Sequence, residues 1–284
     1  MPILELKDST PKACKKVQQS LEHGQVVFLP HGGFQLKTEE HVLLDESVLA
    51  PKQKNISYHH HFQSLSHFNP AYPEKQLLTH AMLQRFALYA KNLVNTMFPG
   101  FEKELEMGRT SYRPAKVEGR MTSLLKDDTR LHVDAFSTTP VHTKRILRVF
   151  SNINPNLEPR VWHVGEAFED VLKTFHAKLP TYSPLKASLL STFKLTKSKR
   201  SHYDHLMLAL HDQMKMDEHY QKVVNKTKFA FPTDSTWMVF TDQVSHAALS
   251  GQFLLEQSFY LPVDSQLFPE CSPLHQWRTY EPTL

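Results

Sequence analysis

The chain has 284 residues and a net charge of +4, and 40% of its residues are hydrophobic, including 18 Phe. This composition can bury the core of one large domain or two small ones. It contains no run of the roughly 20 apolar residues that a membrane span needs, no secretory signal at its start, and only two cysteines, Cys14 and Cys271. We therefore expect a cytoplasmic protein without a disulfide framework. The modest positive charge permits an anionic partner without requiring one.

The first hundred residues are predicted to be mainly helical. Thr10 followed by Pro11 is typical of a helix start, and a short strand is expected at 25–29. Residues 30–73 are rich in His, Pro, Ser and Asn, which predicts irregular structure that includes a solvated run of three histidines. Apolar residues recur at helical spacing over 74–98, which predicts one long amphipathic helix.

The remaining chain alternates between strand and helix patterns. Extended segments are predicted at 109–113, 130–135, 145–153, 160–164, 236–241, 246–249 and 253–261. Residues 166–222 have a helical pattern and separate the strands into two groups. We predict an α+β fold with a jelly-roll core, a type of core that commonly holds a small ligand. The chain would be a single domain over 1–284, with 1–108 as mainly helical N-terminal support and 166–222 as a helical insert.

The most informative motif is His132-Val133-Asp134. On an extended chain the side chains of residues i and i+2 point to the same face, so His132 and Asp134 can bind one ion together. His246 begins a later apolar run and offers a second imidazole. Two histidines and one carboxylate around a metal with an open face form the ligand set of non-haem Fe(II) oxygenases. The alternative is a surface hairpin with a solvated histidine and aspartate.

Three segments carry a resemblance to a known family: RLHVDAF (130–136), RILRVFSNINP (145–155) and TDQVSHAALSGQF (241–253). In order and spacing they resemble the Kdo 3-hydroxylase family, which are Fe(II)- and 2-oxoglutarate-dependent dioxygenases. The resemblance implies a double-stranded β-helix (jelly-roll or cupin-like) core with flanking helices. It also implies Fe(II) as the cofactor, 2-oxoglutarate and O2 as cosubstrates, and His132, Asp134 and His246 as the metal ligands.

The far carboxylate of 2-oxoglutarate needs a cation, and a guanidinium that binds it bidentately suits it best. No basic residue follows His246 closely, so the anchor must come from elsewhere. Arg145 and Arg148 lie three apart on one predicted strand and must face opposite sides. We favour Arg148, because it lies within an apolar run; a salt bridge to a local carboxylate is the alternative.

Other polar residues near these segments are weaker candidates. Arg113 could bind the cosubstrate or the carboxylate of the sugar, and Asn152 shares a strand face with Arg148. The second ring nitrogen of His246 needs a partner, for which Asp242, Gln243 and Ser245 are all close in sequence.

The predicted function is hydroxylation of C3 of a Kdo residue in Kdo–lipid A of lipopolysaccharide, which gives Ko. The substrate implies a cytoplasmic protein that is either free or peripherally bound to the inner membrane. A basic cluster, Lys194, Lys197, Lys199 and Arg200, is either a solvated face or a contact to lipid phosphates. No nucleic-acid partner is expected, and the oligomeric state stays open. The alternatives are a 2-oxoglutarate oxygenase acting on protein or nucleic acid, and a non-catalytic jelly-roll module that binds an anionic sugar.

Overall fold

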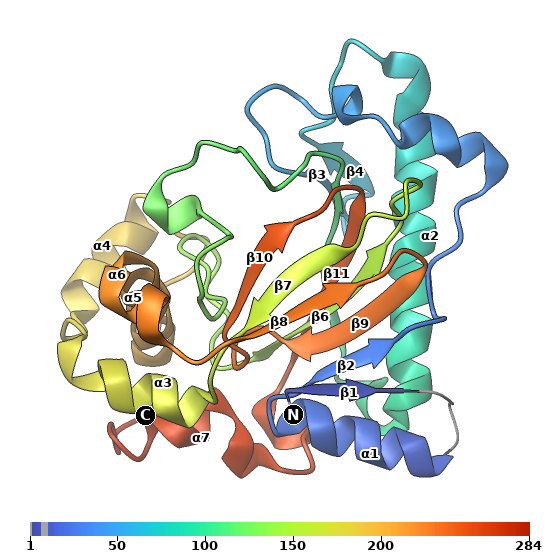
Figure 1. Cartoon of the computed structure of the whole chain (residues 1–284). Helices are drawn as coiled ribbons and strands as arrows, with labels where there is room; N and C mark the ends of the chain where they lie inside the picture. Colours follow the sequence, from blue (N-terminus) through green and yellow to red (C-terminus); the bar gives the residue numbers. More distant parts are fainter. Residues whose placement is uncertain (1, 7–10) are drawn as a thin grey trace.

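A computed structural model of the chain describes residues 2–6 and 11–284, and it consists of two β-sheets flanked by helices (Figure 1). The strands are β1 (Ile3–Glu5), β2 (Val26–Leu29), β3 (Ile56–His59), β4 (Ser64–Ser66), β5 (Glu106–Arg113), β6 (Arg145–Asn152), β7 (Arg160–Val164), β8 (Thr227–Phe231), β9 (Ser235–Phe240), β10 (His246–Ser250) and β11 (Leu254–Leu261). The helices are α1 (Pro11–Glu22), α2 (Pro73–Met97), α3 (Phe168–Phe175), α4 (Pro184–Thr192), α5 (His202–Met216), α6 (Glu218–Val223) and α7 (Pro273–Trp277).

The two sheets form the jelly-roll core. The larger has the strand order β1-β2-β9-β6-β11-β5-β3-β4, and the smaller has the order β10-β7-β8. Apart from the parallel pair β1–β2, neighbouring strands run antiparallel. Aromatic side chains fill the space between the sheets; Phe150, Trp162, Phe231 and Trp237 pack in one buried cluster there.

Strand β6 shows how the pleat sorts side chains between the two faces of the larger sheet. Leu147 and Val149 pack in a cluster with residues of α1 and α2 on the outer face. Arg148 and Phe150 alternate with them and face the interior between the sheets. The strand is buried along its whole length because both of its faces are covered.

Helices α1 and α2 cover the outer face of the larger sheet (Figure 1). The helix predicted over 74–98 is present as α2, with Pro73 at its start, where a missing backbone N–H is tolerated. Thr10, the predicted N-cap of α1, lies outside the described residues. Among the described residues, no helix combines the length and the apolar character that crossing a bilayer requires.

The helical insert contains α3, α4, α5 and α6, which lie together to one side of the sheets (Figure 1). Helix α5 is the longest of the four. It begins with a capping box, in which the hydroxyl of Ser201 and the carboxylate of Asp204 each accept a backbone N–H. Its Leu206, Leu210 and Met214 are buried in a cluster with α3 and α7. This packing fixes the direction in which the remaining faces of α5 point.

Two local predictions were wrong, and one strand was missed. Residues 130–135 form no regular strand; only His132 makes an isolated bridge, to His246. The segment 30–73 contains the short strands β3 and β4, and the strand β8 follows the insert. These short strands have mixed polar sequences, so their extended form depends on pairing with β5 and β7 and not on a strong local pattern.

Candidate active site

The structure brings His132, Asp134 and His246 together. Their ligand atoms all lie within 4.8 Å of one another, and all three residues are buried. The backbones of His132 and His246 exchange two hydrogen bonds, of 3.1 and 2.9 Å, so β10 holds the His-x-Asp segment directly. The backbone N–H of Asp134 donates to the carbonyl of Thr241 at 2.7 Å. The convergence of residues more than a hundred positions apart therefore rests on main-chain bonds.

Both imidazole rings are oriented for metal binding. Nδ1 of His132 donates to the carbonyl of Arg130 and Nδ1 of His246 to the carbonyl of Val244, each at 2.8 Å. A carbonyl oxygen can only accept, so both rings carry their proton on Nδ1 and leave Nε2 free as a ligand. The partner of His246 is thus a main-chain carbonyl and not a side chain of Asp242, Gln243 or Ser245.

The three groups also have the protonation states that a metal requires. Burial lowers the pKa of His132 well below its usual value, with a further contribution from His246, and burial likewise lowers the pKa of His246. Burial alone would raise the pKa of the Asp134 carboxyl, but the positive charges around it, Arg148 foremost, and a hydrogen bond from Thr241 together outweigh burial, and the pKa is lowered. At neutral pH the site therefore presents two neutral imidazoles and a carboxylate, a donor set that fits a divalent iron ion.

The triad lines a cavity of about 230 Å³ that is rich in arginine. Arg148 contacts Asp134 at 3.1 Å and Glu256 at 3.0 Å, and Arg113 contacts the same Glu256 at 2.8 Å. Arg148 therefore faces the cavity, as predicted, and it also makes the local salt bridges that were the alternative. Glu256 joins the two guanidinium groups into one rigid network.

Arg160 is a third cavity arginine, which the sequence analysis missed. It is 3% exposed, and its Nη1 donates to the carbonyl of Gly251 at 3.1 Å. Among the described residues no carboxylate forms a salt bridge with it, and its Nε has no acceptor. Burial and the nearby Arg113 lower the pKa of Arg160 to about 9. This guanidinium is thus a buried cation without a counter-ion.

Trp162 lies two residues further along β7 and lines the same cavity. Its ring stacks on His246 with 5.0 Å between centroids. Its indole Nε1 is buried and has no hydrogen-bond partner, as is also true of Nε of Arg148. Buried donors without acceptors are costly. Their position in one cavity indicates that an anionic, oxygen-rich ligand belongs there.

Arg145 and Asn152 lie outside this cavity. Arg145 is fully buried, donates to Asp242 at 2.7 Å, and stacks over Phe240. The amide of Asn152 donates to the carbonyls of Glu158 and Phe231. Both residues therefore hold parts of the sheet together, and neither is among the described residues that line the cavity.

The insert contributes His211 and Lys215 of α5 to the cavity. The His211 ring contacts that of His132 edge-on, with centroids 5.3 Å apart. The sequence analysis assigned this segment to the helical insert and gave it no residue of the site. The sequence does contain a signal for them. His211 and Lys215 are four residues apart, so they share one face of α5, next to the face that carries Leu210 and Met214.

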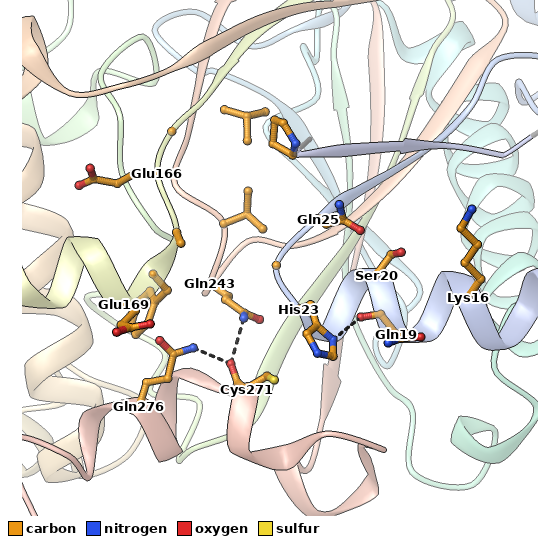
Figure 2. Close-up of a pocket in the computed structure, with 17 residues that line it drawn as sticks. Lys16, Gln19, Ser20, His23, Gln25, Glu166, Glu169, Gln243, Cys271 and Gln276 are labelled. Carbon is orange, nitrogen blue, oxygen red and sulfur yellow. Dashed lines mark hydrogen bonds between the residues drawn. The ribbon is translucent and has the colours of Figure 1, made fainter.

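Two further cavities lie elsewhere in the structure, one next to the metal cavity and one separate from it. An outer cleft of about 470 Å³ shares Asn55, Arg113 and Arg148 with the metal cavity and is also lined by the histidine run at 59–61. Another cavity, of about 700 Å³, lies between α1 and the start of α3, where Gln243 and Gln276 both donate to the carbonyl of Cys271 (Figure 2). Its described lining includes none of the three candidate ligands, so we assign no chemistry to it.

Comparison with known proteins shows which family the chain belongs to. The family model for 3-deoxy-D-manno-oct-2-ulosonic acid (Kdo) hydroxylase matches residues 5–281. A crystal structure of the Kdo hydroxylase KdoO, a non-heme Fe(II) alphaketoglutarate-dependent dioxygenase, in complex with cobalt(II) is 42% identical, with a TM-score of 0.96; the match covers 100% of this chain and 97% of that one. The same enzyme in complex with alphaketoglutarate and Fe(III) gives 42% identity and a TM-score of 0.94, over 99% and 96% of the two chains. No curated protein matches significantly.

Fold and triad together define a dioxygenase of the non-haem iron, 2-oxoglutarate-dependent class. The full-length similarity goes further, and the chain belongs to the Kdo hydroxylase family. The predicted family, the double-stranded β-helix fold and the dependence on Fe(II) and 2-oxoglutarate are confirmed.

Proposed function

We propose that this chain hydroxylates C3 of a Kdo residue in Kdo–lipid A, converting it to Ko, and that His132, Asp134 and His246 hold the iron. The observation that carries the proposal is the convergence of the three ligand atoms in a buried, arginine-rich cavity. When bound, Fe(II) together with 2-oxoglutarate and O2 supplies the oxidative chemistry. The protein orients the reactants and keeps water out.

The donors without acceptors support a position for 2-oxoglutarate. We assign its far carboxylate to Arg160, because the carboxylates near Arg113 and Arg148 already pair with those two residues. Trp162 stacks beside His246 and can add an indole N–H bond. Arg113 and Arg148 flank this position and, through Glu256, keep it rigid.

The outer cleft suits the rest of the glycolipid. It opens from the metal cavity at Arg113 and Arg148 and is lined by exposed Arg109 and Lys197. Phosphates and carboxylates of Kdo–lipid A could contact these cations.

Helix α4 supports peripheral contact with the inner membrane on the cytoplasmic side. Its Leu185 and Leu189 and the following Phe193 recur every four residues and are 79%, 58% and 70% exposed. An exposed apolar stripe of this kind marks an interaction surface. Exposed Lys194 and Lys199 lie beside it, and such a combination favours an anionic lipid surface. The partner we assign is therefore the membrane in which the glycolipid lies.

Two experiments test these proposals. Purified protein with Fe(II), O2 and 2-oxoglutarate should add one oxygen to a Kdo residue of Kdo–lipid A, detected by mass spectrometry. Turnover of 2-oxoglutarate with no Kdo glycolipid accepted would favour an oxygenase of another specificity. Sedimentation with anionic and with neutral vesicles tests the membrane contact. Leu189→Ser with Phe193→Ser should abolish binding to anionic vesicles, and binding that survives this change would exclude α4.

A further inference from the structure

Lys215 is a buried ammonium group whose hydrogen bonds are incomplete. Only 2% of the residue is exposed. Its Nζ donates to the carbonyl of Leu125 at 3.2 Å, while the carboxylate of Asp128 lies 3.9 Å away, beyond hydrogen-bond distance. An ammonium group has three donors, and burial without a paired anion is unfavourable. Burial accordingly lowers the pKa of the Lys215 amine.

The neighbouring Asp128 cannot serve as a dedicated partner. Lys54 donates to it at 3.0 Å, and Arg113 lies 3.6 Å from the same oxygen. Among its described lining residues, the cavity as a whole presents five cations and two carboxylates, Asp128 and Asp134; the cations are Lys54, Arg113, Arg148, Arg160 and Lys215. Bound 2-oxoglutarate brings two negative charges, which we assign to the strand side of the cavity. Glu256, which is behind the lining, pairs with Arg113 and Arg148, and bound Fe(II) would add two positive charges. The cavity therefore keeps an excess of positive charge, and among the described residues Lys215 on the insert side has no carboxylate within hydrogen-bond distance.

The position of Lys215 indicates which anion would pair with it. Arg160 and Trp162 come from β7, so the cosubstrate position lies against the strands. Lys215 comes from α5, so it lines the same cavity from the side of the helical insert, beside Leu125. With the cosubstrate against the strands, a sugar that reaches the metal ligands must occupy the insert side of this cavity, which Lys215 lines.

We propose that Lys215 is the positioning residue that binds the carboxylate of the Kdo unit being hydroxylated. This inference rests on the proposed function. Kdo is a 3-deoxy-2-ulosonic acid, so its carboxylate carbon is bonded to C2, which is bonded to C3. An ammonium group that fixes the carboxylate therefore fixes C3 two bonds away, within the same cavity as the metal ligands. The same contact distinguishes an acidic sugar from a neutral one.

The competing explanation is that Lys215 only ties α5 to the turn at 124–126. Substrate chemistry separates the two roles. We would compare hydroxylation of Kdo–lipid A with that of the same glycolipid carrying methyl-esterified Kdo carboxylates. We expect the wild-type kcat/KM to be about 10- to 100-fold higher for the acid, as for loss of one hydrogen bond to a charged group. This comparison needs no variant, and equal rates on acid and ester would overturn the proposal.

Variants then assign the preference to Lys215. Lys215→Met keeps the apolar stem and should lose the preference for the acid, mainly through KM, with the KM for 2-oxoglutarate unchanged. Lys215→Arg should recover part of the preference, and Lys222→Met, at an exposed lysine of α6, should behave as wild type. A Lys215→Met enzyme that still prefers the acid would overturn the assignment. A wild-type enzyme inactive on every Kdo glycolipid would instead refute the proposed function and the inference with it.

Discussion

Replacing Arg160 by alanine should weaken 2-oxoglutarate binding without destabilising the empty protein. The guanidinium has one acceptor, the Gly251 carbonyl, and its Nε has none among the described residues. A hydrogen bond between charged groups contributes about 1.5–3 kcal/mol. The loss of one such bond should raise the KM for 2-oxoglutarate by about 10- to 150-fold. At saturating 2-oxoglutarate, kcat and the KM for the glycolipid should stay near wild type.

The effect on stability distinguishes this role from a structural one. Truncating one member of a buried ion pair lowers the free energy of unfolding by about 3–5 kcal/mol, because the other charge stays buried without a partner. Arg160 has no such partner, so the free energy of unfolding of the apo protein should change by less than about 1 kcal/mol. The shift in Tm that 2-oxoglutarate produces in the Fe(II)-loaded wild type should largely disappear.

The assays are succinate release against 2-oxoglutarate concentration and thermal unfolding with and without the cosubstrate. Arg278→Ala is the matched control, because this arginine is exposed and contacts only groups far from the cavity, a main-chain oxygen of Leu284 and the ring of His275. A KM for 2-oxoglutarate within twofold of wild type in Arg160→Ala would refute the assignment. A loss of several kcal/mol in the apo protein would show that Arg160 serves the fold.

Three further predictions concern the paired charge and the metal ligands. Arg145→Ala should lower the free energy of unfolding by about 3–5 kcal/mol, measured by chemical denaturation, because it leaves the buried Asp242 carboxylate without its partner. A change below about 1 kcal/mol would contradict this. His246→Ala should weaken anaerobic Fe(II) binding, measured by calorimetry, by more than about 100-fold with an unchanged circular dichroism spectrum, since even indirect ligand partners contribute about 10–100-fold. Finally, apo stability should fall as pH drops below about 6.5, because the unfolded chain binds protons there that His132 and His246 do not accept when folded. The slope should approach about 1.4 kcal/mol per pH unit per histidine, and a variant with glutamine at both positions should lose it.

The metal triad was predictable because its signal is local. His132 and Asp134 are two residues apart, and their shared face survives although the segment is not a regular strand. The alternation in β6 likewise predicted that Arg145 and Arg148 face opposite sides, which the structure bears out. In each case a period of two residues carries the information.

Arg160 and Trp162 were not predictable in the same way, although they too are two residues apart. Their position beside the metal ligands depends on the pairing of β7 with β10, in which Val164 lies opposite His246. Nothing local to either strand specifies that register. The same holds for Lys215, because its place in the cavity depends on how α5 packs on α3 and α7.

The degree of burial does not distinguish structural from functional charged residues in this protein. The number of hydrogen bonds that each buried charge makes within the fold does distinguish them. Arg145 and Arg160 are both almost inaccessible. Arg145 donates to Asp242, Gln243 and Gln266, so its cost of desolvation is met within the fold. Arg160 and Lys215 each donate to a single main-chain carbonyl and keep unused donors beside the metal ligands. A fold that buries a cation without hydrogen-bond acceptors is less stable when no ligand is bound. An anion that supplies those acceptors binds more tightly for the same reason, and its binding stabilises the folded protein.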